Sequence, residues 1–388
     1  MASPAPMLIE CTSQLDSVLR AVTDSPRVAV DVESNGMFAY QQRVCTVQLA
    51  WRAPDGSTTI ALVDALAVPV RELEPLLGDG RVVKVLHDLS FDARVLHLEG
   101  TDLCNVRDTA IAAGYLGRSA TGLASLLASE LGVLVSKEMQ NTNWAIRPLS
   151  TESLDYLAND VRHLLELDTL LLTEAAMRGI DEEVATETAF RLHEALQTQV
   201  DTRPAFARVR GVSQLDELGK RVLKELCDLR EAIARERDLP PQRIINDQLV
   251  LALASRRPAG HGDMARVGPL ARRLRPHLWQ MALEAVRRGL GAMPLTDEEQ
   301  GWVQHGLVDR TMLEAKRSVE KRLQSWRRAE AARRGVDEQV VLPTHCIRLL
   351  ATGEYPTPEH VDALPGFGHS RARRYAELIA QMLSSGDD

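Results

Sequence analysis

The sequence predicts an α/β domain with a mixed sheet and flanking helices, followed by all-helical domains. Over residues 1–200, short β-branched apolar runs alternate with segments of helical periodicity, as in a sheet covered by helices. Beyond a break at Asp201–Pro204, almost every segment has the helical period and is punctuated by proline and glycine. A chain of 388 residues also exceeds one ordinary core. We therefore expect an α/β domain at 1–200, a helical domain at 210–290 and a second one at 308–384, with a linker at 291–307.

The α/β domain is expected to begin with strands. Four apolar, β-branched runs have strand length: 28–32, 45–51, 58–63 and 82–86. Asn35-Gly36 and the segment Tyr40–Arg43 suit the turn of an antiparallel pair formed by the first two strands. Helices are expected near 71–77, 91–98, 108–116 and 122–131, and a long helix from about Thr151, with an apolar stripe of Leu154, Leu157, Val161, Leu164 and Leu165.

Composition and charge narrow the class of protein. The chain has 45% hydrophobic and 26% charged residues, which is typical of a globular protein. Residues 1–200 hold 15 Lys and Arg against 28 Asp and Glu, whereas residues 201–388 hold 31 against 26. An acidic half suits cations and a basic half suits a polyanion, although two domains that merely differ in surface charge would give the same numbers.

Cysteine usage and hydropathy indicate the compartment. The first six residues lack the basic start and apolar core of a signal peptide, and no apolar run could span a bilayer. The five cysteines are far apart and form no C-x-x-C pair, which favours reduced, mostly buried thiols over disulfides or zinc. We expect a cytoplasmic protein without membrane contact.

Two carboxylates close the first predicted strand. Asp31 and Glu33 are two positions apart, so their side chains point to the same face of the sheet. Like charges buried side by side are costly unless a cation neutralises them, which makes the pair a candidate metal site. Exposure at the end of a strand is a common alternative explanation for this pattern taken alone.

A second acidic element follows the fourth predicted strand. Within Leu86–Asp92, Asp88 suits the N-cap of a helix, which leaves Asp92, one turn inside that helix, for another role. We expect His87 to be satisfied by hydrogen bonds rather than to bind a metal.

The third element lies on the long helix. Tyr156 and Asp160 are four residues apart and share one helix face, which His163 continues. They form either an ordinary hydrogen-bonded pair or part of a site.

The ordered combination is more specific than its parts. A strand D-x-E, a helical Asp and a helical Y-x-x-x-D resemble the DEDDy 3′→5′ exonucleases, and the Tyr distinguishes the chain from relatives with His at that position. Other segments of the sequence resemble motifs of the ribonuclease D family. They are an Asp-Thr element in Asn105–Thr109, Lys137, and the W-x-x-R-P-L motif at Trp144–Leu149. The segment Tyr156–Val161 is similar to the family's Y-A-x-x-D-V motif. The resemblance covers residues 25–175 and implies an RNase H-like fold.

The chain departs from the family pattern at three positions. Val32 stands where Thr is frequent, Ala93 where Leu is common, and Asn143 where Asp or Ser is usual. None of these changes removes a charged ligand, so they bear on substrate preference more than on chemistry.

The resemblance implies hydrolysis of phosphodiesters with two divalent metal ions, Mg²⁺ or Mn²⁺. Two such ions about 3.5–4 Å apart stabilise the attacking and leaving oxygens, and hard ions take carboxylate ligands. By resemblance, Asp31 bridges the ions, Glu33 and Asp160 complete the nucleophile-side site, and Asp92 supports the other.

The resemblance also implies roles for residues that do not bind the ions. Tyr156 orients the attacking water, since a hydroxyl with an ordinary pKa near ~10 is a poor base. Lys137 either neutralises a backbone phosphate near the cut or is a solvated surface lysine. Trp144 and Arg147 shape the loop behind Tyr156 rather than contact substrate.

The helical half resembles HRDC domains, which are nucleic-acid-binding helical modules. Within 210–290, the segments that match the HRDC pattern are Leu229–Ala234, Asp238–Leu249 and Leu251–Ala254. Residues 308–384 resemble a second, divergent copy of the domain. In that copy, the glycine turn Leu364–Arg371 leads into the last helix, where backbone N–H groups either meet a phosphate or simply make the turn. Basic pairs recur from Arg256-Arg257 to Arg333-Arg334, either as a solvated face or as a surface that follows phosphates.

Together these features predict a metal-dependent 3′→5′ exoribonuclease that removes 3′-terminal nucleotides from structured RNA precursors such as tRNA. The implied partner is an RNA with a free 3′ end, and neither a membrane nor an obligate protein partner is expected. A 3′→5′ DNA exonuclease with the same carboxylates is one alternative. A non-catalytic RNA-binding scaffold is the other, and loss of one of the four carboxylates would have indicated it.

Overall fold

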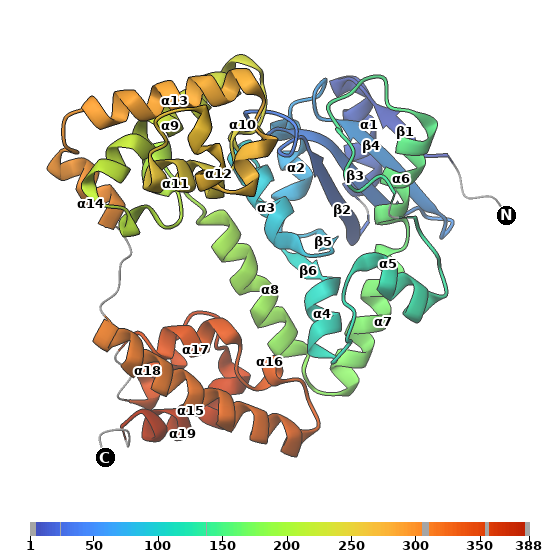
Figure 1. The fold of residues 1–388 in the computed structure, drawn as a ribbon. Helices are drawn as coiled ribbons and strands as arrows, with labels where there is room; N and C mark the ends of the chain where they lie inside the picture. Colours follow the sequence, from blue (N-terminus) through green and yellow to red (C-terminus); the bar gives the residue numbers. More distant parts are fainter. Residues whose placement is uncertain (1–4, 24, 137, 305–309, 354–356, 385–388) are drawn as a thin grey trace. The chain divides into compact units, whose positions relative to one another are not determined.

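The computed structural model describes residues 5–23, 25–136, 138–304, 310–353 and 357–384. Within them, a six-stranded sheet has the order β1-β4-β3-β2-β5-β6 (Figure 1). The strands are β1 (Met7–Ile9), β2 (Arg27–Ser34), β3 (Val44–Arg52), β4 (Thr58–Asp64), β5 (Val83–Leu86) and β6 (Val106–Asp108). The pairs β2–β3 and β3–β4 are antiparallel, whereas β1–β4, β2–β5 and β5–β6 are parallel. The predicted mixed sheet is confirmed.

Helices cover both faces of the sheet because alternate residues of β2 point to opposite sides. Val28, Val30 and Val32 join a core with residues of α1 (Thr12–Thr23), α2 (Glu74–Leu77), α3 (Leu89–Leu98) and the end of α8 (Asp181–Leu196). Ala29 belongs to a second cluster, which α6 (Thr151–Arg162) closes from the other face. Asp31 and Glu33 point to the same face of the sheet as Ala29, because side chains alternate between the two faces along β2. Both carboxylates therefore lie on the face that α6 covers.

The long helix predicted from Thr151 is interrupted. Helix α6 ends at Arg162 and α7 (Leu164–Met177) begins at Leu164, with His163 between them. Helix α6 and the start of α7 pack on the sheet, whereas Leu167 and Leu171, further along α7, pack with α4 (Thr109–Tyr115) and α8. A short helix α5 (Leu123–Leu126) precedes them.

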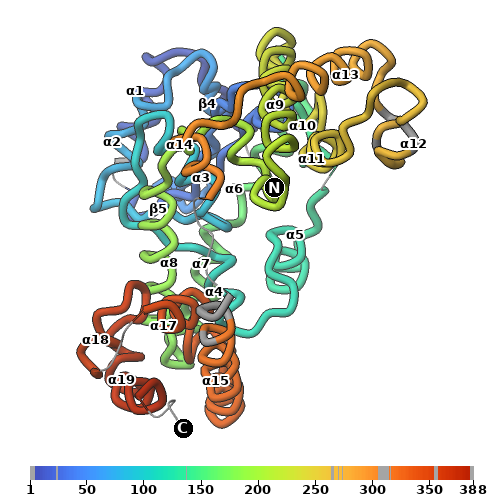
Figure 2. Tube along the Cα trace, turned by 60° about the vertical axis from the view of Figure 1, so that its left-hand side comes forward, coloured from blue at the N-terminus to red at the C-terminus, as the bar shows by residue number. Residues whose placement is uncertain are grey.

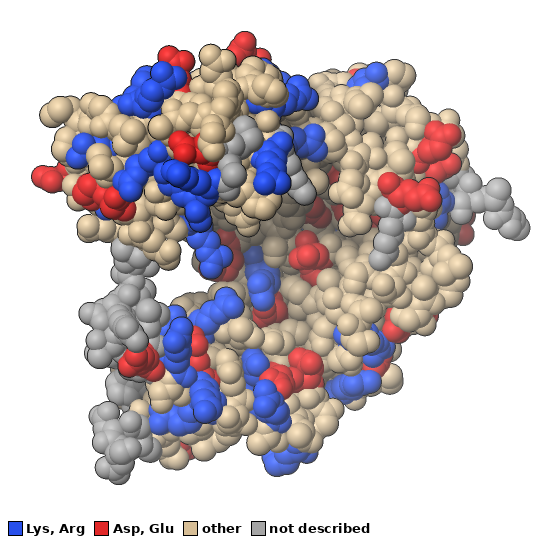
Figure 3. Space-filling view, in the orientation of Figure 1, with Lys and Arg blue, Asp and Glu red and all other residues tan. Residues whose placement is uncertain are grey.

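A separate helical unit consists of residues 199–304 together with residues 35–42. Its helices are α9 (Glu217–Glu236), α10 (Pro241–Ile244), α11 (Asp247–Arg256), α12 (Met264–Val267), α13 (Pro276–Gly291) and α14 (Asp297–Gln304), which surround one apolar core (Figure 2). Lys and Arg side chains gather on one face of this unit (Figure 3).

The connection between β2 and β3 belongs to this helical unit. The Tyr40 hydroxyl donates to Glu231 (2.8 Å), and the Tyr40 amide donates to Asp238 (3.0 Å). The Arg243 guanidinium lies 4.7 Å from the centroid of the Phe38 ring. The predicted antiparallel pairing is correct, but the connection is more than a turn, since it contributes side chains to a helical core.

Residues 310–384 form a smaller helical bundle that packs with the α/β domain in one compact unit. Its helices are α15 (Arg310–Arg334), α16 (Glu338–Val341), α17 (Thr344–Leu350), α18 (Pro358–Asp362) and α19 (His369–Ser384). Across the described part of the chain, no helix has both the length and the apolar character that crossing a bilayer requires. All five cysteines are free thiols, of which Cys45, Cys227 and Cys346 are buried.

Candidate active site

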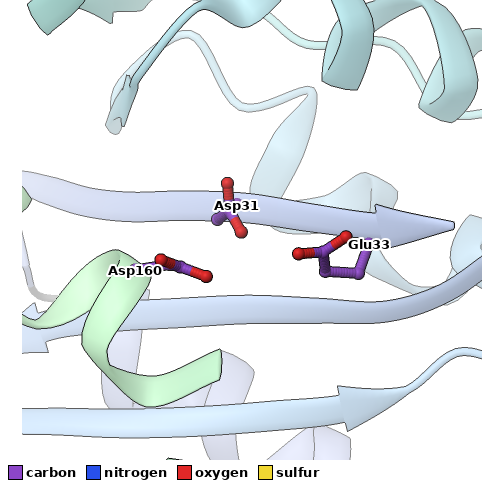
Figure 4. Close-up of side chains that lie close together, drawn as sticks. All are labelled: Asp31, Glu33 and Asp160. Atoms are coloured by element: carbon purple, nitrogen blue, oxygen red, sulfur yellow. The ribbon is translucent and has the colours of Figure 1, made fainter. Parts of the chain in front are cut away.

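Three carboxylates converge beside the end of β2 (Figure 4). Asp31 and Glu33 come from the strand and Asp160 comes from α6, and one oxygen of each lies within 4.8 Å of the others. The two-residue spacing on β2 puts its carboxylates on one face, and α6 packs across that same face. The structure thus brings together three residues that the sequence singles out.

These carboxylates lie in an environment that disfavours their charges. Burial, and then the charges of Asp31 and Asp160, raise the pKa of Glu33 to about 9. Burial and the charge of Asp31 raise the pKa of Asp160 to about 8, and burial raises that of Asp31 to about 6. A divalent cation among them would remove this penalty. Because the available donors are all carboxylate oxygens, the cluster fits a hard ion such as Mg²⁺ or Mn²⁺.

Asp92 lies on α3, beside the three-carboxylate cluster rather than within it. Its side chain is buried, and burial raises its pKa well above the ordinary value. The charges of Asp31 and Glu33 raise it further. The fourth predicted carboxylate is therefore close enough to interact with the cluster, from a different element.

The turn that leads into α3 is built by a residue of β6. Asp88 stands at the N-cap position with φ of 63°, but its side chain makes no capping hydrogen bond among the described residues. Asp108 does so instead, because its carboxylate accepts from the amides of Leu89 (2.7 Å) and Ile111 (2.9 Å) and so caps both α3 and α4. Asp88 thus occupies the N-cap position, as predicted, but its side chain does not supply the capping hydrogen bond. Asp108 fixes the start of the helix that carries Asp92.

His87 is a hydrogen-bonded neutral residue. Its Nδ1 lies 2.8 Å from the hydroxyl of Thr109, which in turn donates to the Leu86 carbonyl (3.1 Å). Burial lowers the pKa of His87 to about 4. These contacts agree with the expectation that hydrogen bonds satisfy it.

Tyr156 lies one turn before Asp160 on α6. Its ring stacks on that of Trp144, with centroids 5.7 Å apart and an interplanar angle of 29°. Burial, and then the charges of Asp160, Glu33 and Asp31, raise the pKa of the hydroxyl above its ordinary value. The hydroxyl therefore stays protonated at neutral pH, where it can donate a hydrogen bond but cannot act as a base.

An ion pair holds the loop behind Tyr156. Arg147 donates to both carboxylate oxygens of Asp64, at 2.6 and 2.7 Å, and to the carbonyls of Cys45 (2.9 Å) and Trp144 (2.7 Å). Trp144 is almost fully buried, and its indole N–H lies close enough to Glu33 to lower the pKa of that carboxyl, partly offsetting burial. Arg147 and Trp144 thus shape the loop, as expected from the sequence.

Asp64 was missed by the sequence analysis. It ends β4 at the position opposite Thr46, which is itself opposite Glu33 on β2, so the three residues form one row across the antiparallel strands. The signal available in the sequence was an acidic residue directly after the apolar run 58–63. Lys137, the predicted phosphate contact, lies outside the described residues.

Comparisons with known proteins show the family. A 3′-5′ exonuclease family model matches residues 6–175, and an HRDC domain model matches residues 219–283 and 316–383. Ribonuclease D of Gluconacetobacter diazotrophicus is 32% identical over 274 residues, which cover 69% of this chain and 68% of the relative. Ribonuclease D of Sphingobium indicum is 31% identical, with coverage of 68% on both sides. The chain belongs to the ribonuclease D family.

This membership confirms the predicted enzyme class, a 3′–5′ exoribonuclease. Solved structures agree on the fold of the ribonuclease D family. Escherichia coli RNase D superimposes with a TM-score of 0.67 at 22% identity and covers 100% of both chains. A protein from Bifidobacterium adolescentis gives a TM-score of 0.74 at 21% identity and covers 99% of both chains.

Proposed function

We propose that the protein removes nucleotides from the 3′ ends of structured RNA precursors, such as those of tRNA, by two-metal-ion hydrolysis. The observation that carries this proposal is the convergence of Asp31, Glu33 and Asp160, with Asp92 and Tyr156 beside them. The E. coli relative is described as an exoribonuclease involved in structured RNA processing, which supports the substrate class. The partner is then an RNA with a free 3′ end.

The carboxylates would hold the ions in distinct roles. Asp31 would bridge them, Glu33 and Asp160 would complete the site on the nucleophile side, and Asp92 would support the other site. Bound Mg²⁺ or Mn²⁺ would supply an activated water and would offset charge on the attacking and leaving oxygens. The raised pKa values of the three clustered carboxylates support this assignment, since a bound cation would offset the cost of holding their charges together.

The chain's own donors would orient the reactants. Tyr156, held protonated, would donate a hydrogen bond to the attacking water and fix its direction. Trp144 would hold Tyr156 by stacking on its ring. Five free thiols suit the reducing conditions of the cytoplasm, where we place the protein.

A digestion assay tests the proposal. The purified chain is incubated with a 3′-overhang RNA and with the matching DNA, in Mg²⁺, in Mn²⁺ and in EDTA. We expect shortening of the RNA from its 3′ end, none of it in EDTA, and a loss of rate of roughly a hundredfold or more in Asp31→Asn and Asp160→Asn. Asp155→Asn is the matched control, because Asp155 is an exposed residue of the same helix.

Each other outcome has a defined meaning. Selective digestion of the DNA would replace the proposal with a DNA exonuclease. RNA that stays bound and intact with wild type in both metals would favour a non-catalytic scaffold. Full activity of Asp160→Asn would remove that carboxylate from the metal site.

A further inference from the structure

Helix α8 presents buried carboxylates to the C-terminal helical bundle, residues 310–384. Figures 1 and 2 show α8 reaching from the sheet to this bundle, and its first turn is acidic. Glu183 and Glu187 are only 1% and 4% exposed. Buried carboxylates require partners: those of Glu183 come from α19, whereas Glu187 accepts from Tyr115 of α4 and Arg191 of α8 and lies 3.6 Å from His345 of α17.

The start of α19 binds two of the carboxylates. The Ser370 amide donates to Glu182 (2.8 Å), and the Ser370 hydroxyl donates to Glu183 (2.8 Å). Arg374, one turn later, donates to the same Glu183 oxygen (2.7 Å). The first amides of a helix lack backbone partners and favour negative charge. The position where the sequence left room for a phosphate is therefore taken by carboxylates of α8.

The glycine turn lies against α8 with no space for a side chain. A Cβ on Gly366 would overlap the rings of His345 and Phe190, and a Cβ on Gly368 would lie 2.8 Å from atoms of Thr186. Both glycines also have positive φ, 72° and 79°. The rings of Phe190 and His345 stack at 3.7 Å across the same junction.

A buried arginine completes the junction. Arg371 is fully buried and donates to the carbonyls of Val340 (3.0 Å) and Phe367 (2.9 Å) and to the Tyr115 hydroxyl (3.3 Å). The Tyr115 hydroxyl donates to Glu187 (3.0 Å). Val340 belongs to the same apolar cluster as residues of α4 and α7, so the core of the α/β domain continues into the bundle.

Some arginines of the bundle have partners within it. Arg327 is buried and contacts Glu338 and the Leu342 carbonyl. Arg333 pairs with Glu330, and Arg334 donates to the Tyr375 hydroxyl. Arg327 and Arg334 thus serve the bundle's own packing, whereas the Arg333 pair lies at the surface.

We propose that residues 310–384 are an intramolecular docking module: the glycine turn and the start of α19 recognise the acidic first turn of α8 instead of nucleic acid. The RNA backbone is left to the helical unit of residues 199–304. The turn with the sequence signature of a nucleic-acid-binding module has become the attachment point of the bundle to the nuclease.

Hydrogen exchange of the full chain tests this assignment without any variant. In EDTA, we expect the amides of 364–375 to exchange slowly without RNA and to gain no further protection when a single-stranded RNA is added. Added protection should fall within 199–304. Protection of 364–375 by RNA would overturn the proposal.

Paired substitutions test the contacts themselves. Ser370→Ala with Arg374→Gln should speed exchange across 364–375 and 182–190 by about tenfold. The RNA dissociation constant and its salt dependence should stay within about twofold of wild type. Arg373→Gln, the exposed neighbour on α19, is the matched control and should change neither.

Two results would reject the docking role. Unchanged exchange in the double variant would mean that these contacts do not hold the bundle. Weaker RNA binding with unchanged exchange would mean that the turn contacts RNA. Since exchange is measured without catalysis, a chain that cut no RNA would disprove the proposed function and leave this test intact.

Discussion

At the scale of single residues, the clustered carboxylates make the metal-free protein sensitive to pH. The folded pKa values of Glu33 and Asp160, about 9 and about 8, exceed their ordinary values of 4.5 and 3.8. The folded state therefore binds these protons more tightly than the unfolded chain does. The resulting stability is fully present below about pH 4 and is lost as the pH rises through the folded pKa values.

Thermal unfolding in EDTA checks this dependence. We expect Glu33→Gln to gain stability relative to wild type as the pH is raised from about 4 to about 9, because the amide carries no charge to bury. Mn²⁺ should reduce or reverse the difference, since wild type then has its counter-ion. Parallel stability curves for the two proteins in EDTA would contradict the raised pKa of Glu33.

Removal of the Tyr156 hydroxyl is expected to slow catalysis. Tyr156→Phe keeps the ring that stacks on Trp144 and removes only the hydrogen-bond donor. We expect kcat to fall roughly a hundredfold, with KM changed little, because in the proposed mechanism the hydroxyl would orient the attacking water. Single-turnover digestion of the 3′-overhang RNA measures this. An increase in KM at constant kcat would instead assign Tyr156 to substrate binding.

At the scale of secondary-structure elements, the loop that carries Trp144 depends on the pair between Arg147 and Asp64. Their side chains are 25% and 7% exposed, so removing one charge leaves the other poorly solvated. We expect Asp64→Asn to lower the free energy of unfolding by about 2–3 kcal/mol. Urea denaturation measures this. Asp55→Asn, in the exposed β3–β4 turn, is the control for loss of an aspartate. If the two substitutions lowered the free energy of unfolding equally, the pair between Arg147 and Asp64 would not stabilise the loop.

The same elements show what the sequence could predict. The central strands were recognised because their β-branched runs are long enough to show a pattern, and the two-residue spacing of Asp31 and Glu33 correctly predicted that both carboxylates point to one face of the sheet. Strands β1 and β6 have three residues each, too few for periodicity. The interruption at His163 is not revealed by the apolar stripe, because Leu164 and Leu165 beyond it still pack in the same cluster as Leu157 and Val161 of α6.

Side chains that serve a distant element were the hardest to predict. Asp108 caps two helices from the end of β6, and Asp64 pairs with an arginine far along the chain. Each is one acidic residue among many in the sequence, and only its long-range contacts set it apart. Tyr40 is a similar case, since its partner Glu231 belongs to a helical unit formed much later in the chain.

At the scale of the whole molecule, the basic residues of the second half of the chain differ in whether they have partners within the protein. In the bundle of residues 310–384, Arg327, Arg333 and Arg334 bind acidic or hydroxyl partners. In the unit of residues 199–304, Arg256, Arg272 and Arg287 are exposed. All six belong to similar basic pairs in the sequence, and these pairs alone do not show which arginines have partners: next to the exposed Arg256 and Arg287, Arg257 and Arg288 pair with Asp216 and Glu225.

The salt dependence of RNA binding tests this difference. Each phosphate contact with single-stranded RNA contributes about 0.7 to the slope of log K against log salt concentration. Replacing Arg256, Arg272 and Arg287 by Gln together should therefore lower the magnitude of the slope by up to about two. Fluorescence anisotropy of a labelled single-stranded RNA in EDTA, over a series of KCl concentrations, measures the slope without cleavage.

The matched control changes the same number of charges in the bundle. Arg317, Arg328 and Arg333 lie on the exposed side of α15, and their replacement by Gln alters the net charge identically. If RNA follows the helical unit of residues 199–304, this control keeps the wild-type slope. An equal fall in both triple variants would show that the slope reports net charge rather than local contacts, and the division of labour between the two helical regions would fail. A fall in the control alone would place the RNA on the bundle and would contradict its role as a docking module.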